Sequence, residues 1–168
     1  MTLARDPQQL VYDFQLDLSR FGDEVEDGAL KVFHESAEQV AEAVVVGNQY
    51  GPGVAVDTGF ARSSFRIGVN APVDGPSVRP FISRRVTRPG VERFPAALDL
   101  APIGAAQLGD VVYITTQVNY AQHLEFEAKR RRFGPYKGRS TAFIDPVEAR
   151  FDTIVDDAAD RVGYGVSE

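Results

Sequence analysis

The spacing of apolar residues changes at a glycine-rich stretch near residue 50, and this change constrains the fold more than any other feature of the sequence. Upstream of residues 47–53 (Gly-Asn-Gln-Tyr-Gly-Pro-Gly), apolar residues recur at steps of three and four, as they do on one face of an α-helix. Downstream, residues 64–70 alternate apolar with polar or small side chains, as in a half-buried β-strand. A helical N-terminal part and a strand-containing middle part are therefore expected.

Two helices are expected before residue 47. Asp6 and Pro7 suit a helix N-terminus, because an acidic N-cap accepts free backbone amides and proline is tolerated in the first turn. Gly22 is expected to end the first helix, and the second is expected to run from about residue 23 to 46, with Gly28 as a kink or its true start. The apolar residues are Leu10, Val11, Phe14, Leu18 and Phe21 in the first helix and Val25, Ala29, Val32, Phe33, Ala37, Val40, Ala41 and Val44 in the second.

Strands and loops are expected in the middle of the chain. Gly109 and Asp110 form a turn ahead of residues 111–118, the stretch richest in β-branched residues. Residues 71–95 hold five of the ten prolines and are interpreted as an extended loop, because proline removes a donor from a β-ladder. Short helical turns are expected within residues 98–108 and 120–127.

The last predicted helix begins at Asp145 and Pro146. Its apolar face comprises Val147, Phe151, Ile154, Val155, Ala158 and Val162. Together the elements predict an α+β fold in which N-terminal amphipathic helices and a C-terminal helix pack on a small, mostly antiparallel β-sheet. One domain of 168 residues is expected, with a helical extension over residues 1–22, an insertion or extended loop over 72–106 and a basic loop over 128–140.

Composition excludes several classes of protein. The chain has no cysteine, which rules out disulfides and thiolate-bound zinc, and its two histidines argue against a histidine-rich metal site. We therefore expect no cofactor and no bound metal. The N-terminus lacks the apolar segment of a secretory signal, and no apolar run is long enough to span a membrane, so a soluble protein is expected.

Charge is segregated along the chain, although the net value is only −6. Residues 23–42 carry seven acids against one base, whereas residues 129–139 carry six bases and no acid. Such blocks suit docking between oppositely charged surfaces. The candidate interaction residues are Lys129, Arg130, Arg131, Arg132, Phe133, Tyr136, Lys137 and Arg139, together with Arg84 and Arg85. Basic residues interleaved with aromatics also suit a nucleic-acid backbone, but the acidic net charge favours docking on protein.

Patterns that could indicate catalysis have simpler explanations. Asp57-Thr58-Gly59 matches the aspartic-protease triplet, but such an enzyme needs a second copy of it or a dimer with a flap, and neither is visible. Asp57 and Thr58 are better explained as caps of the helical turn over residues 59–63. His123 lies two residues from Glu125, a spacing at which helical side chains do not face each other, and His34 is interpreted as structural. No catalytic residue is predicted, although a small hydrolase with an unrecognised site stays an alternative.

Two stretches, residues 56–65 and 119–126, resemble the signature of a family of tailed-phage tail-completion proteins, the lambda-like minor tail and neck components. The elements occur in the family's order over about residues 23–162. They are Val56-Asp57-Thr58-Gly59 with Arg62, Gly109-Asp110 before the β-branched strand, Tyr120-Ala121 with Leu124-Glu125, and the helix after Pro146. The resemblance implies that Asp57, Thr58, Gly59, Arg62, Tyr120 and Glu125 are structural.

The resemblance also implies a function. Members of the family are small α+β structural proteins of the virion, not enzymes, that form rings, commonly hexamers, at the head-proximal end of the tail. The implied partners are copies of the chain itself, the tail tube protein and a head-completion, stopper or connector protein, with a passing contact with DNA and none with a membrane. The implied location is the tail or neck of the virion, reached from the host cytoplasm during assembly. A nucleic-acid-binding module that uses residues 129–139 is the alternative.

Overall fold

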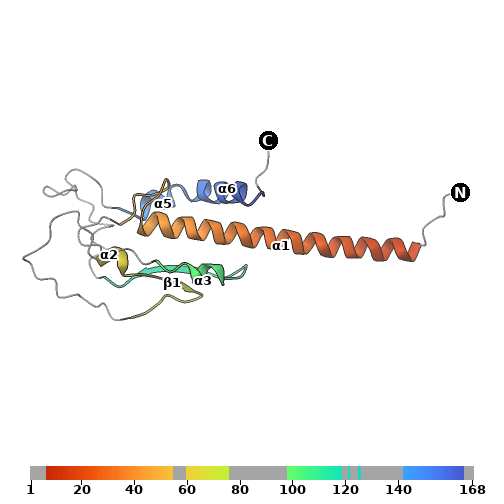
Figure 1. Ribbon diagram of the computed structural model, residues 1–168, viewed down its shortest axis with the longest axis horizontal. Helices are drawn as coiled ribbons and strands as arrows, with labels where there is room; N and C mark the ends of the chain where they lie inside the picture. Colours follow the sequence, from red (N-terminus) through yellow and green to blue (C-terminus); the bar gives the residue numbers. More distant parts are fainter. Residues whose placement is uncertain are drawn as a thin grey trace, which may run out of the picture.

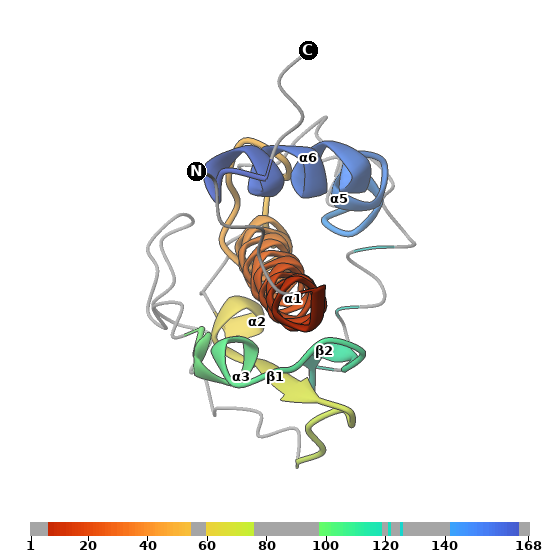
Figure 2. The same ribbon diagram turned by 90° about the vertical axis from the view of Figure 1, so that its right-hand side faces the viewer.

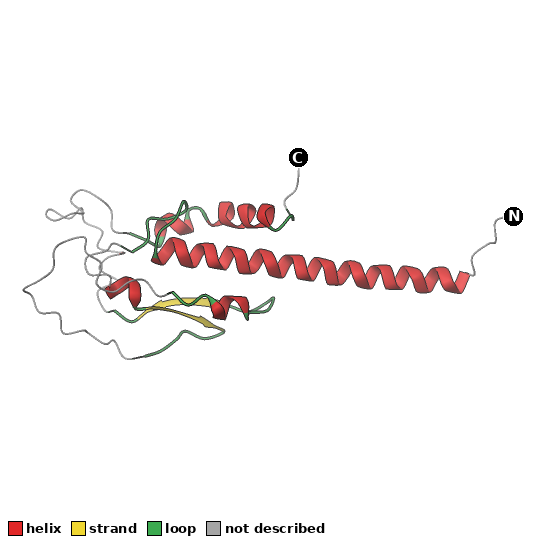
Figure 3. Ribbon diagram, in the orientation of Figure 1, coloured by secondary structure: helices red, strands yellow, loops and turns green. Residues whose placement is uncertain are grey.

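The computed structural model describes residues 7–54, 60–75, 98–118, 121, 125 and 142–164, with side chains of the first helix described from Tyr12 onward. The predicted α+β class is confirmed (Figures 1 and 3). The elements in chain order are α1 (Pro7–Val45), α2 (Phe60–Ser63), β1 (Phe65–Val69), α3 (Ala101–Gly104), β2 (Val112–Thr116), α5 (Asp145–Glu148) and α6 (Phe151–Arg161).

The C-terminal half of α1 is the middle layer of the fold. Seen along this helix, α5 and α6 lie on one side, and α2, α3 and the two strands lie on the other (Figure 2). Two apolar clusters follow from this arrangement. One joins Val45 to Ile154 of α6 and Phe65 of β1, and the other joins Ala41 to Ile67 and Ile103. The helix is therefore covered on two opposite sides, which accounts for its many small and β-branched residues near the C-terminus.

The predicted break at Gly22 is wrong, because α1 is one continuous helix of 39 residues. Glycine inside a helix costs only about 1 kcal/mol relative to alanine, which is less than the loss of several backbone hydrogen bonds at a break. Gly28 lies inside the helix too, and a Cβ there would overlap the ring of Tyr164. Gly28 is thus neither a start nor a kink but the place where the ring of Tyr164 lies against α1.

The described strands form an antiparallel pair that agrees with the predicted strand positions. Phe65 faces Thr116, Ile67 faces Ile114 and Val69 faces Val112. Gly109, with φ of +93°, makes the predicted turn before β2, since a residue with a Cβ is strained in that conformation. The side chain of Asn70 closes the same end of the pair by donating to Asp110 Oδ1 at 2.7 Å.

The predicted C-terminal helix is divided into α5 and α6, and this is a second correction. The turn between them lets the guanidinium of Arg150 donate to the backbone carbonyl of Gln49 at 2.6 Å, which ties it to the loop after α1. Val147, Ile154 and Ala158 are buried as predicted, but Phe151, the first residue of α6, is 51% exposed. The apolar face that was predicted for a single helix is therefore buried within α6 at Ile154 and Ala158, but it is exposed at Phe151 in the first turn of α6.

Candidate functional site

The first motif stretch borders the strand pair, and its Phe65 shares an apolar cluster with Ala121 of the second stretch, although about fifty residues separate the two stretches in the sequence. Ser64 Oγ and Thr116 Oγ1 lie 2.7 Å apart, and Ser64 Oγ also donates to the carbonyl of Ala61. The guanidinium of Arg62 donates to the carbonyl of Val54 at 3.2 Å. These contacts hold α2 and the start of β1 to neighbouring backbone. The polar groups of this region therefore stabilise the local structure of the chain.

Glu125 joins the second motif stretch to the C-terminal layer. Its side chain is only 4% exposed, and each carboxylate oxygen accepts hydrogen bonds from backbone amides. Oε2 accepts from Phe143 at 2.7 Å and from Ile144 at 3.1 Å, and Oε1 accepts from Asp145 at 3.0 Å. Backbone amides at a helix start have no partner within the helix, so a buried carboxylate satisfies them and holds α5 in place.

An apolar cavity of about 370 Å³ lies beside Glu125. Val40 and Val44 of α1, Phe65 and Phe143 are among its lining residues. Among the described residues of this lining, Glu125 is the only ionisable one, and both of its oxygens already accept from backbone amides. General acid–base catalysis needs a carboxyl or imidazole that can reach a substrate proton, and the described lining supplies none that is uncommitted.

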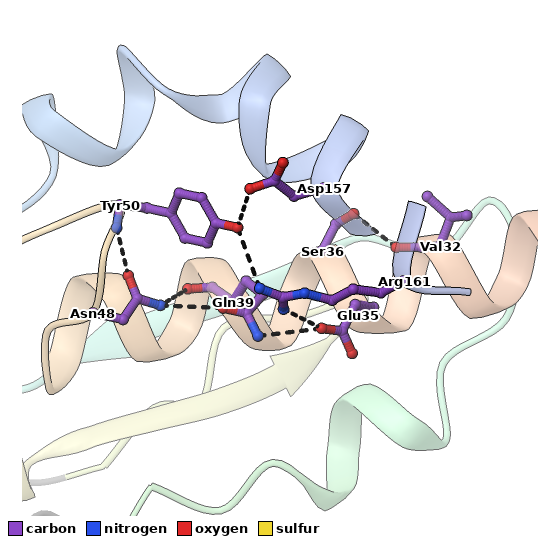
Figure 4. A network of polar contacts seen from close by, with 8 residues as sticks. All are labelled: Val32, Glu35, Ser36, Gln39, Asn48, Tyr50, Asp157 and Arg161. Atoms are coloured by element: carbon purple, nitrogen blue, oxygen red, sulfur yellow. Dashed lines mark hydrogen bonds and ion pairs between the residues drawn. The ribbon is translucent and has the colours of Figure 1, made fainter. Parts of the chain in front are cut away.

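A polar network connects α1 to α6 (Figure 4). The Tyr50 hydroxyl donates to Asp157 Oδ2 at 2.5 Å, and the guanidinium of Arg161 contacts Glu35 Oε1 at 2.6 Å. The hydrogen bond to Asp157 and the burial of the hydroxyl raise the pKa of Tyr50, and the bond to Glu35 raises the pKa of Arg161. Gln39 and Asn48 extend the network to the loop after α1. Every one of these groups has a partner within the fold, which indicates a structural role.

Many of the predicted interaction and motif residues lie outside the described residues. These are Asp57, Thr58, Gly59, Arg84, Arg85, Tyr120, His123 and the whole basic segment Lys129, Arg130, Arg131, Arg132, Phe133, Tyr136, Lys137 and Arg139. The predicted insertion over residues 72–106 is described only at its two ends. His34 is described, and its Nε2 lies 2.8 Å from the carbonyl oxygen of Ala106, which agrees with the structural interpretation.

Six of the exposed large apolar side chains among the described residues lie on the N-terminal half of α1, which extends beyond the other layers (Figure 1). We call residues Pro7–Asp27 the protruding segment; at 1.5 Å per residue it is roughly 30 Å long. From Phe14 to Asp27 every residue is exposed. Its large apolar side chains have exposed fractions between 46% and 65%, and they are Tyr12, Phe14, Leu16, Leu18, Phe21 and Val25. Monomeric proteins rarely expose large apolar patches, so the grouping of Phe14, Leu18, Phe21 and Val25 on one side of an exposed helix indicates an interaction surface.

The sequence pattern indicated this helical stripe and predicted that the N-terminal helices pack on the sheet, but it did not indicate that the stripe is exposed. Phe14, Leu18, Phe21 and Val25 follow one another at steps of four, three and four, a spacing typical of helix–helix seams. The signal that could have revealed its exposure is the length of the helix. If Gly22 does not break it, α1 is far longer than the two short strands and the C-terminal helix that are available to cover it.

The described residues contain neither a cluster of potential metal ligands nor a helix that could cross a membrane. No three His, Asp or Glu side chains gather there as metal ligands would. Over the same ranges no helix has the length and apolar character needed to cross a membrane.

Comparison with known proteins gives no match: no family model fits the chain, and no curated protein or solved structure is significantly similar to it. The resemblance to tail-completion proteins therefore stays a prediction, which depends on the two motif stretches and their order.

Proposed function

We propose that this chain is a structural subunit of a tailed-phage particle that forms a ring at the head-proximal end of the tail. In this role it completes the tail and contacts the tail tube protein on one side and a head-completion or connector protein on the other. It acts by binding copies of itself and these neighbours and does not transform a substrate.

The protruding segment is the observation that carries this proposal. A helix gains most of its stability in a protein from the packing of an apolar face, and here six large apolar side chains are 46% to 65% exposed in the described part of the chain. A protein with this surface is expected to function inside an assembly. The motif resemblance supplies the kind of assembly, since the family builds rings.

The use of the motif residues supports the same conclusion. Glu125 and Arg62 bind backbone groups of the chain itself, and Ser64 binds Thr116 on the paired strand. A catalytic site would instead present an uncommitted acid or base to a space that a substrate can enter, whereas the Glu125 oxygens beside the cavity already accept from backbone amides. The described motif residues stabilise a scaffold, as the resemblance implies for a ring subunit.

Charge provides a second means of assembly. The acidic α1 surface of one copy and the basic segment over residues 129–139 of the next can attract each other and fix the register of neighbours. Replacing Arg130, Arg131 and Arg132 together with glutamate is expected to leave the single chain folded but to abolish ring or particle assembly. Circular dichroism checks the fold, and negative-stain imaging checks the assembly. Normal infectious particles that carry this variant would contradict the proposal.

The nucleic-acid alternative predicts a different result from the same variant. If residues 129–139 bind DNA, the wild-type chain shifts DNA in a gel with a steep dependence on salt, and the glutamate variant does not. Rings that form equally well from both proteins, combined with such a shift, would favour the alternative.

A further inference from the structure

The protruding segment continues the geometry of the buried half of α1. Residues about 18 apart lie at the same angle around the axis, because 18 residues make five turns of an α-helix. Phe14 therefore aligns with Val32 and Leu18 with Ser36, whereas Leu16 aligns with His34. The two sides on which α1 is covered in the fold are thus the two sides on which its exposed half is apolar.

The first of these sides is the phenylalanine face, formed by Phe14, Leu18, Phe21 and Val25. The next position in its four–three spacing is Gly28, where the ring of Tyr164 rests. The Tyr164 hydroxyl also donates to the carbonyl of Glu24 at 2.6 Å. The C-terminal region therefore covers this side of α1 as far as Gly28. The part of the same side that precedes Gly28, which is the phenylalanine face, is exposed.

The second side is the tyrosine face, formed by Tyr12 and Leu16. It points in the direction of His34, which contacts Ala106 just after α3. At 100° per residue the two faces lie roughly 170° apart, on opposite sides of the helix. Asp23, two turns beyond Leu16, marks where the tyrosine face becomes polar.

Three acids of the protruding segment lie between the faces. Asp13, Asp17 and Glu24 occupy one arc of the helix, at angles outside both apolar faces. A neighbour can therefore cover the phenylalanine face, or the tyrosine face at Tyr12 and Leu16, without burying these three side chains, which would be costly. Asp23 limits the contact on the tyrosine face to the part that precedes it.

We infer that the protruding segments of neighbouring copies of this chain pack side by side, with the phenylalanine face of one copy against the tyrosine face of the next. This contact rests on the proposed function and specifies its main interface. Two unlike faces on opposite sides of a helix are what a heterologous contact requires, whereas a twofold dimer buries a single face against itself. Repetition of the contact around an axis covers both faces of every copy, and all helices then run parallel.

The test uses three double variants of the full chain with matched changes in charge. Phe14→Glu with Phe21→Glu alters the phenylalanine face, and Tyr12→Glu with Leu16→Glu alters the tyrosine face. Gln15→Glu with Arg20→Gln changes the net charge equally but lies outside both faces, so it is the control. Native mass spectrometry of each protein gives the number of copies per assembly.

Loss of the ring is expected for either face variant alone, and the control variant is expected to form the wild-type ring. A mixture of the two face variants is expected to give mixed dimers and nothing larger, because one intact contact remains between unlike copies. Formation of these dimers also shows that both variants are folded. Phe14→Leu with Phe21→Leu is expected to keep the ring.

Three outcomes would overturn the inference. One is a wild-type ring from either glutamate face variant, which leaves the proposed function intact but places the ring contact elsewhere. The second is a mixture of the two face variants in which only one variant forms dimers, with itself. This result indicates that a face packs against the same face of another copy. The third is a wild-type chain that stays single beside the tail tube protein, which contradicts both the inference and the proposed function.

Discussion

Glu125 shows how a single buried carboxylate can hold two distant parts of the chain together. Its two oxygens accept three backbone hydrogen bonds from Phe143, Ile144 and Asp145. Buried donors that lose an acceptor keep their desolvation cost, so the contribution of this residue is larger than that of an exposed glutamate of the same layer.

Glu125→Gln is therefore expected to lower the free energy of unfolding by about 1 to 3 kcal/mol, because the amide group turns a donor toward backbone donors. Chemical denaturation measures this change. The matched control is Glu148→Gln at an exposed position of α5, with an expected change within about 0.5 kcal/mol. Equal stability of the two variants would mean that the Glu125 contacts are not made in solution.

Tyr50 gives a prediction about pH. Its pKa is raised by the hydrogen bond to Asp157 and by burial, so the folded state favours the protonated hydroxyl. The stability from this bond is present below the unfolded pKa of about 10 and is lost as the pH rises through the higher folded value.

Tyr50→Phe is expected to cost about 1 to 2 kcal/mol at neutral pH, because a hydrogen bond to a charged partner is removed. The difference between wild type and variant is expected to shrink above pH 10, as measured by urea unfolding over a pH series. Tyr113→Phe, in the strand layer, is the control. A difference that grows with pH would show that the sign of the Tyr50 shift is wrong.

At the scale of elements, the two glycines within α1 are expected to respond differently to substitution. A Cβ at Gly22 meets open space, whereas a Cβ at Gly28 would overlap Tyr164. Gly22→Ala is expected to stabilise the helix by about 0.5 to 1 kcal/mol. Gly28→Ala is expected to gain nothing, because the helix gain is offset by displacement of the Tyr164 ring and loss of its bond to Glu24.

Far-UV circular dichroism during thermal unfolding compares these variants. The two substitutions are expected to become equivalent in a Tyr164→Ala background, since the second glycine then has free space as well. A persistent difference in that background would show that Tyr164 does not rest on Gly28.

Local patterns predicted the α+β class, both strands, the helical turn of α3 and the start of α5. These features depend on alternation, β-branched content and proline placement over a few residues. The sequence misled at Gly22, since glycine marks a helix end only when flanking residues do not sustain the helix. It also did not indicate that Phe14, Leu18 and Phe21 are exposed, because periodicity reveals an apolar face but not what covers it. The Glu125 contacts depend on residues about twenty positions away and have no local signal.

At the scale of the whole molecule, one half of α1 is enclosed by the chain and the other half carries the same two-sided apolar pattern without cover. Salt is expected to act on the charge blocks and much less on the apolar faces, because only the former are screened. Raising the salt concentration is therefore expected to weaken assembly through residues 129–139 while leaving the effect of the Phe14 and Phe21 variant unchanged, as seen in native mass spectra over a salt series. If added salt restored assembly of the Phe14 and Phe21 variant, the main contact between copies would be electrostatic and not apolar.

The most direct test of the proposed structural role is the native mass of the purified full chain, alone and with the tail tube protein, together with negative-stain images. A closed ring of identical copies that joins the end of the tube is expected. A chain that stays single under both conditions while converting a small molecule would contradict the proposed role.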